Sequence, residues 1–325
     1  MKFFRKGETE TAPFLATVIL FWKCSLRFVS PVAVNPSLFV FDASPCPFGL
    51  DHQEEAMCRG KEEQGASAAL HSPGASTGGP LPPVTEEELM SSGHELHESY
   101  TCPLCCLPIA LPAGKHSRFK SCCTKQVCNG CILASHQRGM GDTCPFCRTP
   151  TPKGDAAMLA LVRKRVDAKD PKAMEFLAHA YYHEDYGLQQ DVPRAIEMWT
   201  EAANLGDLAA HCRLGFKYYH GYGVEQDGAR GARHLQHAAM QGHLESRYVL
   251  GIFEQGNENH ETACQHWMIS AKMGDSHSLG EIKEMFMNGL ATKAQYAEAL
   301  RGYQDAVEET ESPQREEAKA FFQQK

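Results

Sequence analysis

Cysteine is the residue type through which this sequence could do chemistry. The chain contains 14 cysteines, and nine of them lie between Cys102 and Cys147. A Cys-x-x-Cys turn presents two thiolates to one zinc ion, and zinc takes four such ligands. Three of these turns supply six ligands, so the pattern predicts two Zn²⁺ ions, the second completed from the middle of the segment. The pairs are Cys102 with Cys105, Cys122 with Cys123, Cys128 with Cys131, and Cys144 with Cys147.

The alternative use of clustered cysteines is a disulfide framework, which requires a secretory context. The N-terminal apolar run, Pro13 to Trp22, is about half the length needed to cross a bilayer. Glu8 and Glu10 interrupt the basic start of the chain, and no small-x-small cleavage site follows. We therefore expect an intracellular protein, cytoplasmic or nuclear, with no membrane association and with thiols that bind metal.

The order of the cysteine pairs resembles a RING-type zinc finger. In that family the first and third ligand pairs hold one zinc ion, and the second and fourth pairs hold the other. The resemblance implies a cross-brace fold, with Cys102, Cys105, Cys128 and Cys131 in the first site. It assigns Cys144 and Cys147 to the second site, which is completed from the region of Cys122 and Cys123.

One position departs from the family pattern. The usual run is Cys-Gly-His-x-Phe-Cys, whereas this chain has Cys123-Thr-Lys-Gln-Val-Cys128. Lys125 stands at the histidine position, and a protonated ammonium cannot bind zinc. Cys122 could take its place beside Cys123, or a nearby histidine, His116 or His136, could do so; the adjacent cysteine is the favoured ligand. Cys106 is expected to be a spare buried thiol.

RING fingers act mostly as ubiquitin ligases. They form no covalent intermediate but hold a charged ubiquitin-conjugating enzyme in a reactive conformation, so their catalysis is positioning. The resemblance implies that Leu104 and Pro145 contact that enzyme. It also implies that Arg148 forms hydrogen bonds to both ubiquitin and the enzyme.

Two other functions are open. Lys125 at a ligand position favours a zinc-binding adaptor that lacks ligase activity. Nucleic-acid binding is suggested by residues 101–150, which carry six basic residues and one acidic residue in a chain of net charge −8. This segment has no basic recognition helix, and its aromatic residues are only Phe119 and Phe146, so a nucleic-acid partner is not expected. Nucleotide-binding glycine loops and H-E-x-x-H do not occur, and no G-x-S-x-G nucleophile elbow is recognised.

The elements that must position these residues follow from composition and periodicity. Residues 1–95 comprise an undetermined leader and a low-complexity stretch rich in Gly, Ser, Pro and Glu, so this N-terminal region is predicted to be largely disordered. Residues 96–152 form the RING-type segment. Residues 153–311 are rich in alanine and leucine with helical spacing, and residues 312–325 are a C-terminal tail.

The helical segment repeats. Ala202-Ala203 with Gly206 recurs 36 residues later as Ala238-Ala239 with Gly242, and Ser270-Ala271 with Gly274 follows 32 residues after that. A period in the thirties predicts stacked units, each made of two helices. In the first unit we expect helices near 171–183 and 192–205. Asp191 is the predicted N-cap of the second helix, and Gly206 follows its end.

These units resemble Sel-one-like repeats, a subfamily of the tetratricopeptide type. The stretch from Leu214 to Gly242 carries the pattern Leu-Gly, Tyr-Tyr, Gly-x-Gly-Val with an Asp, and Ala-Ala-x-x-Gly. The resemblance implies a right-handed solenoid over about residues 170–275 that binds protein partners or substrates on its concave face. Helices near 155–167 and 292–309 are predicted to cap it. The predicted fold is a small zinc-stabilised cross-brace domain followed by an all-α repeat solenoid.

The histidines of the repeats offer a weaker signal. His183 and His220 recur with the repeat, so they are predicted to be structural or surface residues. His234 and His237 could share one helix face as metal ligands. The sequence indicates no third ligand for them.

Overall fold

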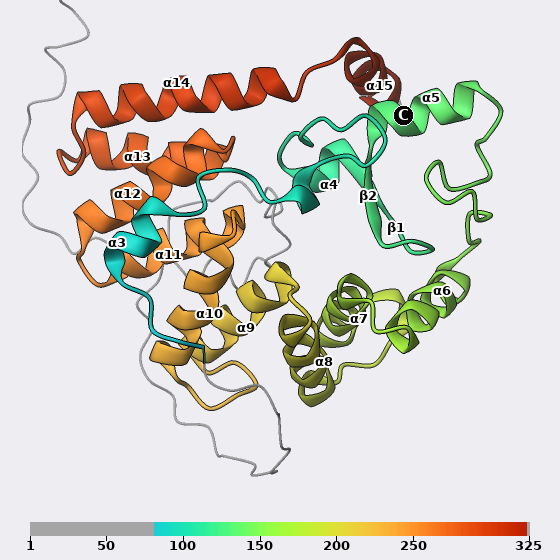
Figure 1. Cartoon of the computed structure of the whole chain (residues 1–325), viewed down its shortest axis with the longest axis horizontal. Helices are drawn as coiled ribbons and strands as arrows, with labels where there is room; N and C mark the ends of the chain where they lie inside the picture. Colours follow the sequence, from blue (N-terminus) through green and yellow to red (C-terminus); the bar gives the residue numbers. More distant parts are fainter. Residues whose placement is uncertain (1–80, 324–325) are drawn as a thin grey trace, which may run out of the picture. The chain divides into compact units, whose positions relative to one another are not determined.

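The computed structural model describes residues 81–323, so the predictions for the leader and for most of the low-complexity stretch lie outside the described residues. Figure 1 shows a cysteine-rich part and an array of helices. The elements before residue 150 are α3 (Glu86–Ser91), η1 (Glu98–Tyr100), α4 (Ala113–His116), β1 (Ser117–Lys120), β2 (Lys125–Cys128) and α5 (Asn129–Gln137). The later elements are α6 (Asp155–Asp167), α7 (Pro171–His183), η2 (Asp185–Gly187), α8 (Val192–Asn204), α9 (Leu208–His220), α10 (Gly228–Met240), α11 (Leu244–Gly256), α12 (His260–Lys272), α13 (Ser276–Met287), α14 (Lys293–Glu309) and α15 (Pro313–Gln323).

The helices from α7 onward pack as successive hairpins. Helix α7 pairs with α8, α9 with α10, α11 with α12, and α13 with α14, and each hairpin contacts the next one along the chain. Helix α6 packs on α7 at the start of the array. The predicted repeat solenoid is therefore present, and α6 and α14 lie where flanking helices are expected.

The helix ends follow the signals in the repeat. Asp191 caps α8 by accepting a hydrogen bond from the backbone N–H of Arg194 at 3.1 Å, and Asp227 caps α10 in the same way from Arg230 at 2.9 Å. Each cap accepts a hydrogen bond from a backbone N–H that has no acceptor within its own helix. The first unit ends at Gly206 with φ of 89°, a conformation that costs glycine little.

Small residues let the paired helices approach closely. A Cβ atom on Gly231 of α10 would lie 2.6 Å from the carbonyl oxygen of Gly215 on α9, so the two backbones pack directly against each other. A Cβ atom on Gly251 of α11 would lie 2.3 Å from Nε1 of Trp267 on α12. Leu214-Gly215 recurs 36 residues later as Leu250-Gly251, and both glycines lie where the two helices of a unit touch.

The core of the array is built from buried apolar side chains on the facing sides of these hairpins. Trp199 and Trp267 are buried, and the indole N–H of Trp267 donates to the carbonyl oxygen of Tyr248 at 3.2 Å. Among residues 81–323, every helix falls short of the length and apolar character required to cross a membrane.

The prediction of disorder for residues 1–95 is wrong at its C-terminal end. Helix α3 begins at a capping box formed by Thr85 and Glu88, and Leu89 is buried in the core of the repeats. The guanidinium group of Arg247, itself buried, donates to the carbonyl oxygens of Leu89 at 2.9 Å and Ser92 at 2.7 Å. Contacts with distant helices therefore order a segment whose own composition predicts disorder.

The C-terminal residues are also more structured than the predicted tail. Helix α15 packs against α5 of the cysteine-rich part, as Figure 1 shows. Ala318 is buried, and the side-chain amide of Gln137 donates to the carboxylate of Glu317 at 2.7 Å. The last helix of the chain thus belongs to the surroundings of the cysteines.

Candidate metal centre

A short hairpin and the helix after it set the middle cysteines in place. Strands β1 and β2 pair antiparallel, with Ser117 opposite Cys128 and Lys120 opposite Lys125. The turn between the strands holds Cys122 and Cys123, and helix α5 starts immediately after Cys128. The hairpin therefore separates the second cysteine pair from the third by the length of a strand.

The first and last cysteine pairs lie in two turns of the same construction. Each turn runs from a threonine to a proline that form an isolated bridge, Thr101 with Pro108 and Thr143 with Pro150. The residue after the second cysteine has positive φ in both, 57° at Cys106 and 60° at Arg148. Both turns therefore present their two sulfur atoms from an equivalent backbone.

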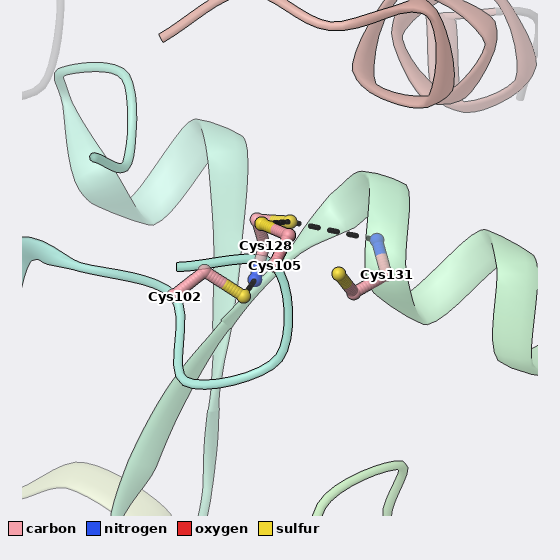
Figure 2. Close-up of side chains that lie close together, drawn as sticks. All are labelled: Cys102, Cys105, Cys128 and Cys131. Carbon is pink, nitrogen blue, oxygen red and sulfur yellow. Dashed lines mark hydrogen bonds between the residues drawn. The ribbon is translucent and has the colours of Figure 1, made fainter. Parts of the chain in front are cut away.

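The first cluster unites Cys102, Cys105, Cys128 and Cys131, as Figure 2 shows. The four sulfur atoms lie within 4.8 Å of one another, and the Sγ atoms of Cys105 and Cys128 are 3.8 Å apart. The backbone N–H of Cys128 donates to Sγ of Cys102 at 3.4 Å, and that of Cys131 donates to Sγ of Cys128 at 3.5 Å. Such N–H donors favour the thiolate form that a metal ion requires.

The second cluster unites Cys122, Cys123, Cys144 and Cys147, again within 4.8 Å. The Sγ atoms of Cys123 and Cys144 are 3.8 Å apart, and those of Cys122 and Cys147 are 3.3 Å apart. Cys122 completes this set of four, and neither His116 nor His136 belongs to it. Lys125 is exposed on β2.

The spacing of the sulfur atoms fits a tetrahedral zinc ion. Zinc–sulfur bonds of about 2.3 Å place tetrahedral sulfur ligands roughly 3.8 Å apart, which matches the separations of Cys105 from Cys128 and Cys123 from Cys144. Four thiolates are also the soft donor set that zinc or an iron–sulfur site prefers. Both clusters are therefore competent to hold a metal ion, and the cysteine pairs alternate between them along the chain.

The thiols in each cluster interact strongly. Hydrogen bonds from the Cys128 and Cys131 thiols hold the pKa of Cys102 well below its usual range, and the bond with Cys102 raises the pKa of Cys131. In the second cluster, burial raises the pKa of Cys123 to about 11. A metal ion must displace these shared protons, so metal binding at both clusters is expected to weaken as the pH falls.

The tips of the two matching turns are apolar and exposed. Leu104 is 41% exposed and Phe146 is 42% exposed, while Pro145 is half-buried and Arg148 is exposed. Phe146 was not among the predicted contact residues, although it occupies the same place in its turn as Leu104. Comparison of Cys-Pro-Leu-Cys with Cys-Pro-Phe-Cys is the signal that could have found it. Cys106 is exposed, which corrects the expectation of a buried thiol.

The structure supplies a third histidine beside His234 and His237. His211 of α9 lies with its Nδ1 atom 3.0 Å from Nδ1 of His234 and its ring centroid 4.5 Å from that of His237. His211 Nε2–H donates to the carbonyl oxygen of Ala203 at 3.1 Å. The Nδ1 atom of His211 must then accept a hydrogen bond from the Nδ1–H group of His234, so these two rings form a hydrogen-bonded pair.

Comparison with known proteins supports the repeat part of the chain. The Sel1 repeat model matches residues 171–207 and 208–243, which cover the hairpins α7–α8 and α9–α10. A Sel1 repeat protein from Oxalobacter formigenes is 22% identical, with a TM-score of 0.42 over 56% of this chain and 72% of that one. A protective antigen of uropathogenic Escherichia coli with an SLR fold is also 22% identical, with a TM-score of 0.41 over 56% of this chain and 38% of that one. A search of curated proteins gave no match.

The choice of Cys122 as the eighth ligand can be tested directly. We expect Cys122→Ser to lower the metal content of the protein from two ions to one, because three thiolates bind zinc far more weakly than four. The matched control is Cys106→Ser, an exposed cysteine outside both clusters. Metal content is measured by elemental mass spectrometry after gel filtration. If Cys122→Ser keeps two bound ions and His116→Ala or His136→Ala loses one, the eighth ligand is that histidine and not Cys122.

Proposed function

We propose that this chain is a zinc-dependent ubiquitin-protein ligase of the RING type whose helical repeats bind protein partners or substrates. The observation that carries the proposal is the alternation of the cysteine pairs. Pairs one and three share one cluster, and pairs two and four share the other. This alternation supports the cross-brace arrangement that the resemblance to RING fingers implies.

The exposed turn tips give the proposal its contact surface. A ligase of this kind needs an apolar surface that a ubiquitin-conjugating enzyme can bury and a donor that can fix the position of ubiquitin. Leu104 and Phe146 offer the apolar contact, together with half-buried Pro145 beside Phe146. The exposed guanidinium group of Arg148 offers several N–H donors to carbonyl oxygens.

The metal ions would have a structural role in this mechanism. Bound zinc would hold the two matching turns at a fixed separation, and none of the reacting atoms would need to touch it. The chain's own task is then to bind the charged enzyme and to restrict the motion of its ubiquitin, which raises the rate without acid–base chemistry.

The repeats supply the second half of the proposal. Residues 171–243 match the Sel1 repeat, and stacked helical hairpins create long surfaces suited to protein binding. Their partner would be the protein that becomes modified. A zinc-binding adaptor would use the same repeats without recruiting a conjugating enzyme.

The experiment that tests ligase activity is discharge of ubiquitin from a panel of charged conjugating enzymes by the zinc-loaded full chain. We expect acceleration with at least one enzyme. We expect Leu104→Ala and Arg148→Ala to reduce it by about tenfold or more, the scale of one lost contact of roughly 1.4 kcal/mol. Lys153→Ala, an exposed basic residue beyond the second turn, is the matched control. If the folded, metal-loaded protein accelerates no enzyme in the panel, the adaptor function replaces the ligase.

A further inference from the structure

The C-terminal helix α15 reaches into the first cysteine cluster through one side chain. Arg315 is 8% exposed and lies over the loop that carries Cys105. Its guanidinium group donates to Sγ of Cys105 at 3.4 Å and to the carbonyl oxygen of Leu107 at 3.1 Å. It also donates to the carbonyl oxygens of Pro108 and of Thr310 in its own chain segment. One buried cation thus ties a sulfur ligand, the loop behind it and the start of α15 together.

The backbone of α15 contacts a second turn of the same cluster. Gly130 lies between Cys128 and Cys131, and a Cβ atom there would lie 3.1 Å from both Cγ and the backbone nitrogen of Arg315. The absence of a side chain at Gly130 therefore lets α15 sit directly on this turn. Helix α15 contacts both cysteine turns of the first cluster. At the second cluster, Arg165 of α6 donates to the backbone carbonyl oxygen of Cys122 at 3.0 Å and not to a sulfur atom.

We propose that α15 completes the first metal site and that Arg315 is its positioning residue. The inference rests on the proposed zinc-binding function. Four thiolates around one Zn²⁺ ion carry a net charge of about −2. A buried guanidinium group next to Cys105 offsets part of this charge, and its hydrogen bonds to the loop carbonyls fix the direction from which Cys105 approaches the ion. Residues that orient metal ligands in this way typically change metal affinity 10- to 100-fold.

The test is a competition between the full-length protein and a chelator, with Co²⁺ as the probe. Cobalt bound by four thiolates absorbs visible light, so the two sites can be followed without any activity assay. We expect Arg315→Ala to weaken one of the two sites by about 10- to 100-fold and to leave the other unchanged. Arg315→Lys, which retains the charge and the stem on Gly130 but has one donor group, should lie between Arg315→Ala and the wild type.

The matched control is Lys319→Ala, which removes a basic residue of α15 that pairs with Glu316 at 2.6 Å. It should leave both cobalt affinities unchanged. If both cobalt ions bind Arg315→Ala and Arg315→Lys as tightly as they bind the wild type, the inference is overturned and the metal sites stand. Failure of the wild type to bind cobalt at all would instead overturn the proposed metal-binding function. The helical circular dichroism signal reports whether each variant is folded.

Discussion

Removal of the proposed zinc ions is expected to unfold residues 101–150 while the repeats stay folded. The cysteine-rich segment has two four-residue strands and a nine-residue helix, and its small core consists largely of the cysteines themselves with Ile109, Val127 and Ile132. Such a core cannot offset the conformational entropy of about 50 ordered residues. Structural zinc supplies on the order of 10 kcal/mol per site, so its loss should be decisive.

Trypsin offers a selective readout, because the segment contains six cleavage positions. These positions are Lys115, Arg118, Lys120, Lys125, Arg138 and Arg148. Chelation should expose them to rapid cleavage, which mass spectrometry of the fragments can follow. The fluorescence of Trp199 and Trp267, both buried in the repeats, should stay constant and serves as the internal control. Equal protection of the six positions with and without chelator would show that metal does not hold the segment together.

The repeats were predictable because their signals are local. The cap at Asp191 and the glycine after α8 act within one unit, and the 36-residue period carries the same signals into the next unit. The structure confirms the helices that they predict. The ordered segment before residue 100 could not be predicted in this way. Its stability depends on Arg247, which lies more than 150 residues away in the chain.

In the candidate site, too, some features follow from the nearby sequence and others depend on distant parts of the chain. The resemblance to RING fingers implied which cysteine pairs could share an ion, and the structure brings those cysteines together. The sequence left Cys122, His116 and His136 as alternatives because the answer depends on how the turn after β1 bends. The contact between Arg315 and Cys105 joins residues 210 positions apart, and no periodicity links them.

Acid is expected to destabilise the repeats well before the carboxylates are fully protonated. Burial lowers the pKa of His211 to about 4 and the pKa values of His234, His243 and His266 to about 3. Four basic groups add to the effect of burial on His234, namely Arg230, Arg233, His211 and His237, and the ring of Tyr218 stacks on it with centroids 5.8 Å apart. A proton on Nδ1 of His211 would also break the hydrogen bond between His211 and His234.

The direction of this change in stability follows from proton binding in the folded and unfolded states. Between pH 6.5 and about 4 these histidines bind protons in the unfolded chain and not in the folded one, so the free energy of unfolding falls as the pH falls. Burial raises the pKa of Glu175 to about 7. In this pH range Glu175 binds one proton in the folded chain that it does not bind in the unfolded chain, so it stabilises the folded state as the pH falls and offsets the effect of one histidine. Four histidines outweigh it, and a loss of several kcal/mol is expected between pH 6.5 and 4.5, at about 1.4 kcal/mol per proton and pH unit.

The measurement is urea unfolding followed by tryptophan fluorescence at a series of pH values. His234→Gln should reduce the slope of unfolding free energy against pH by about one proton, roughly 1.4 kcal/mol per pH unit. This comparison uses the slope, so a constant loss of stability caused by the substitution does not affect it. Gln304→Ala, at an exposed position without a titratable side chain, should leave the slope unchanged. A wild-type stability that is flat between pH 6.5 and 4.5 would mean that these histidines are protonated in the folded repeats, and the tight packing of α9 against α10 would then have to accommodate charge.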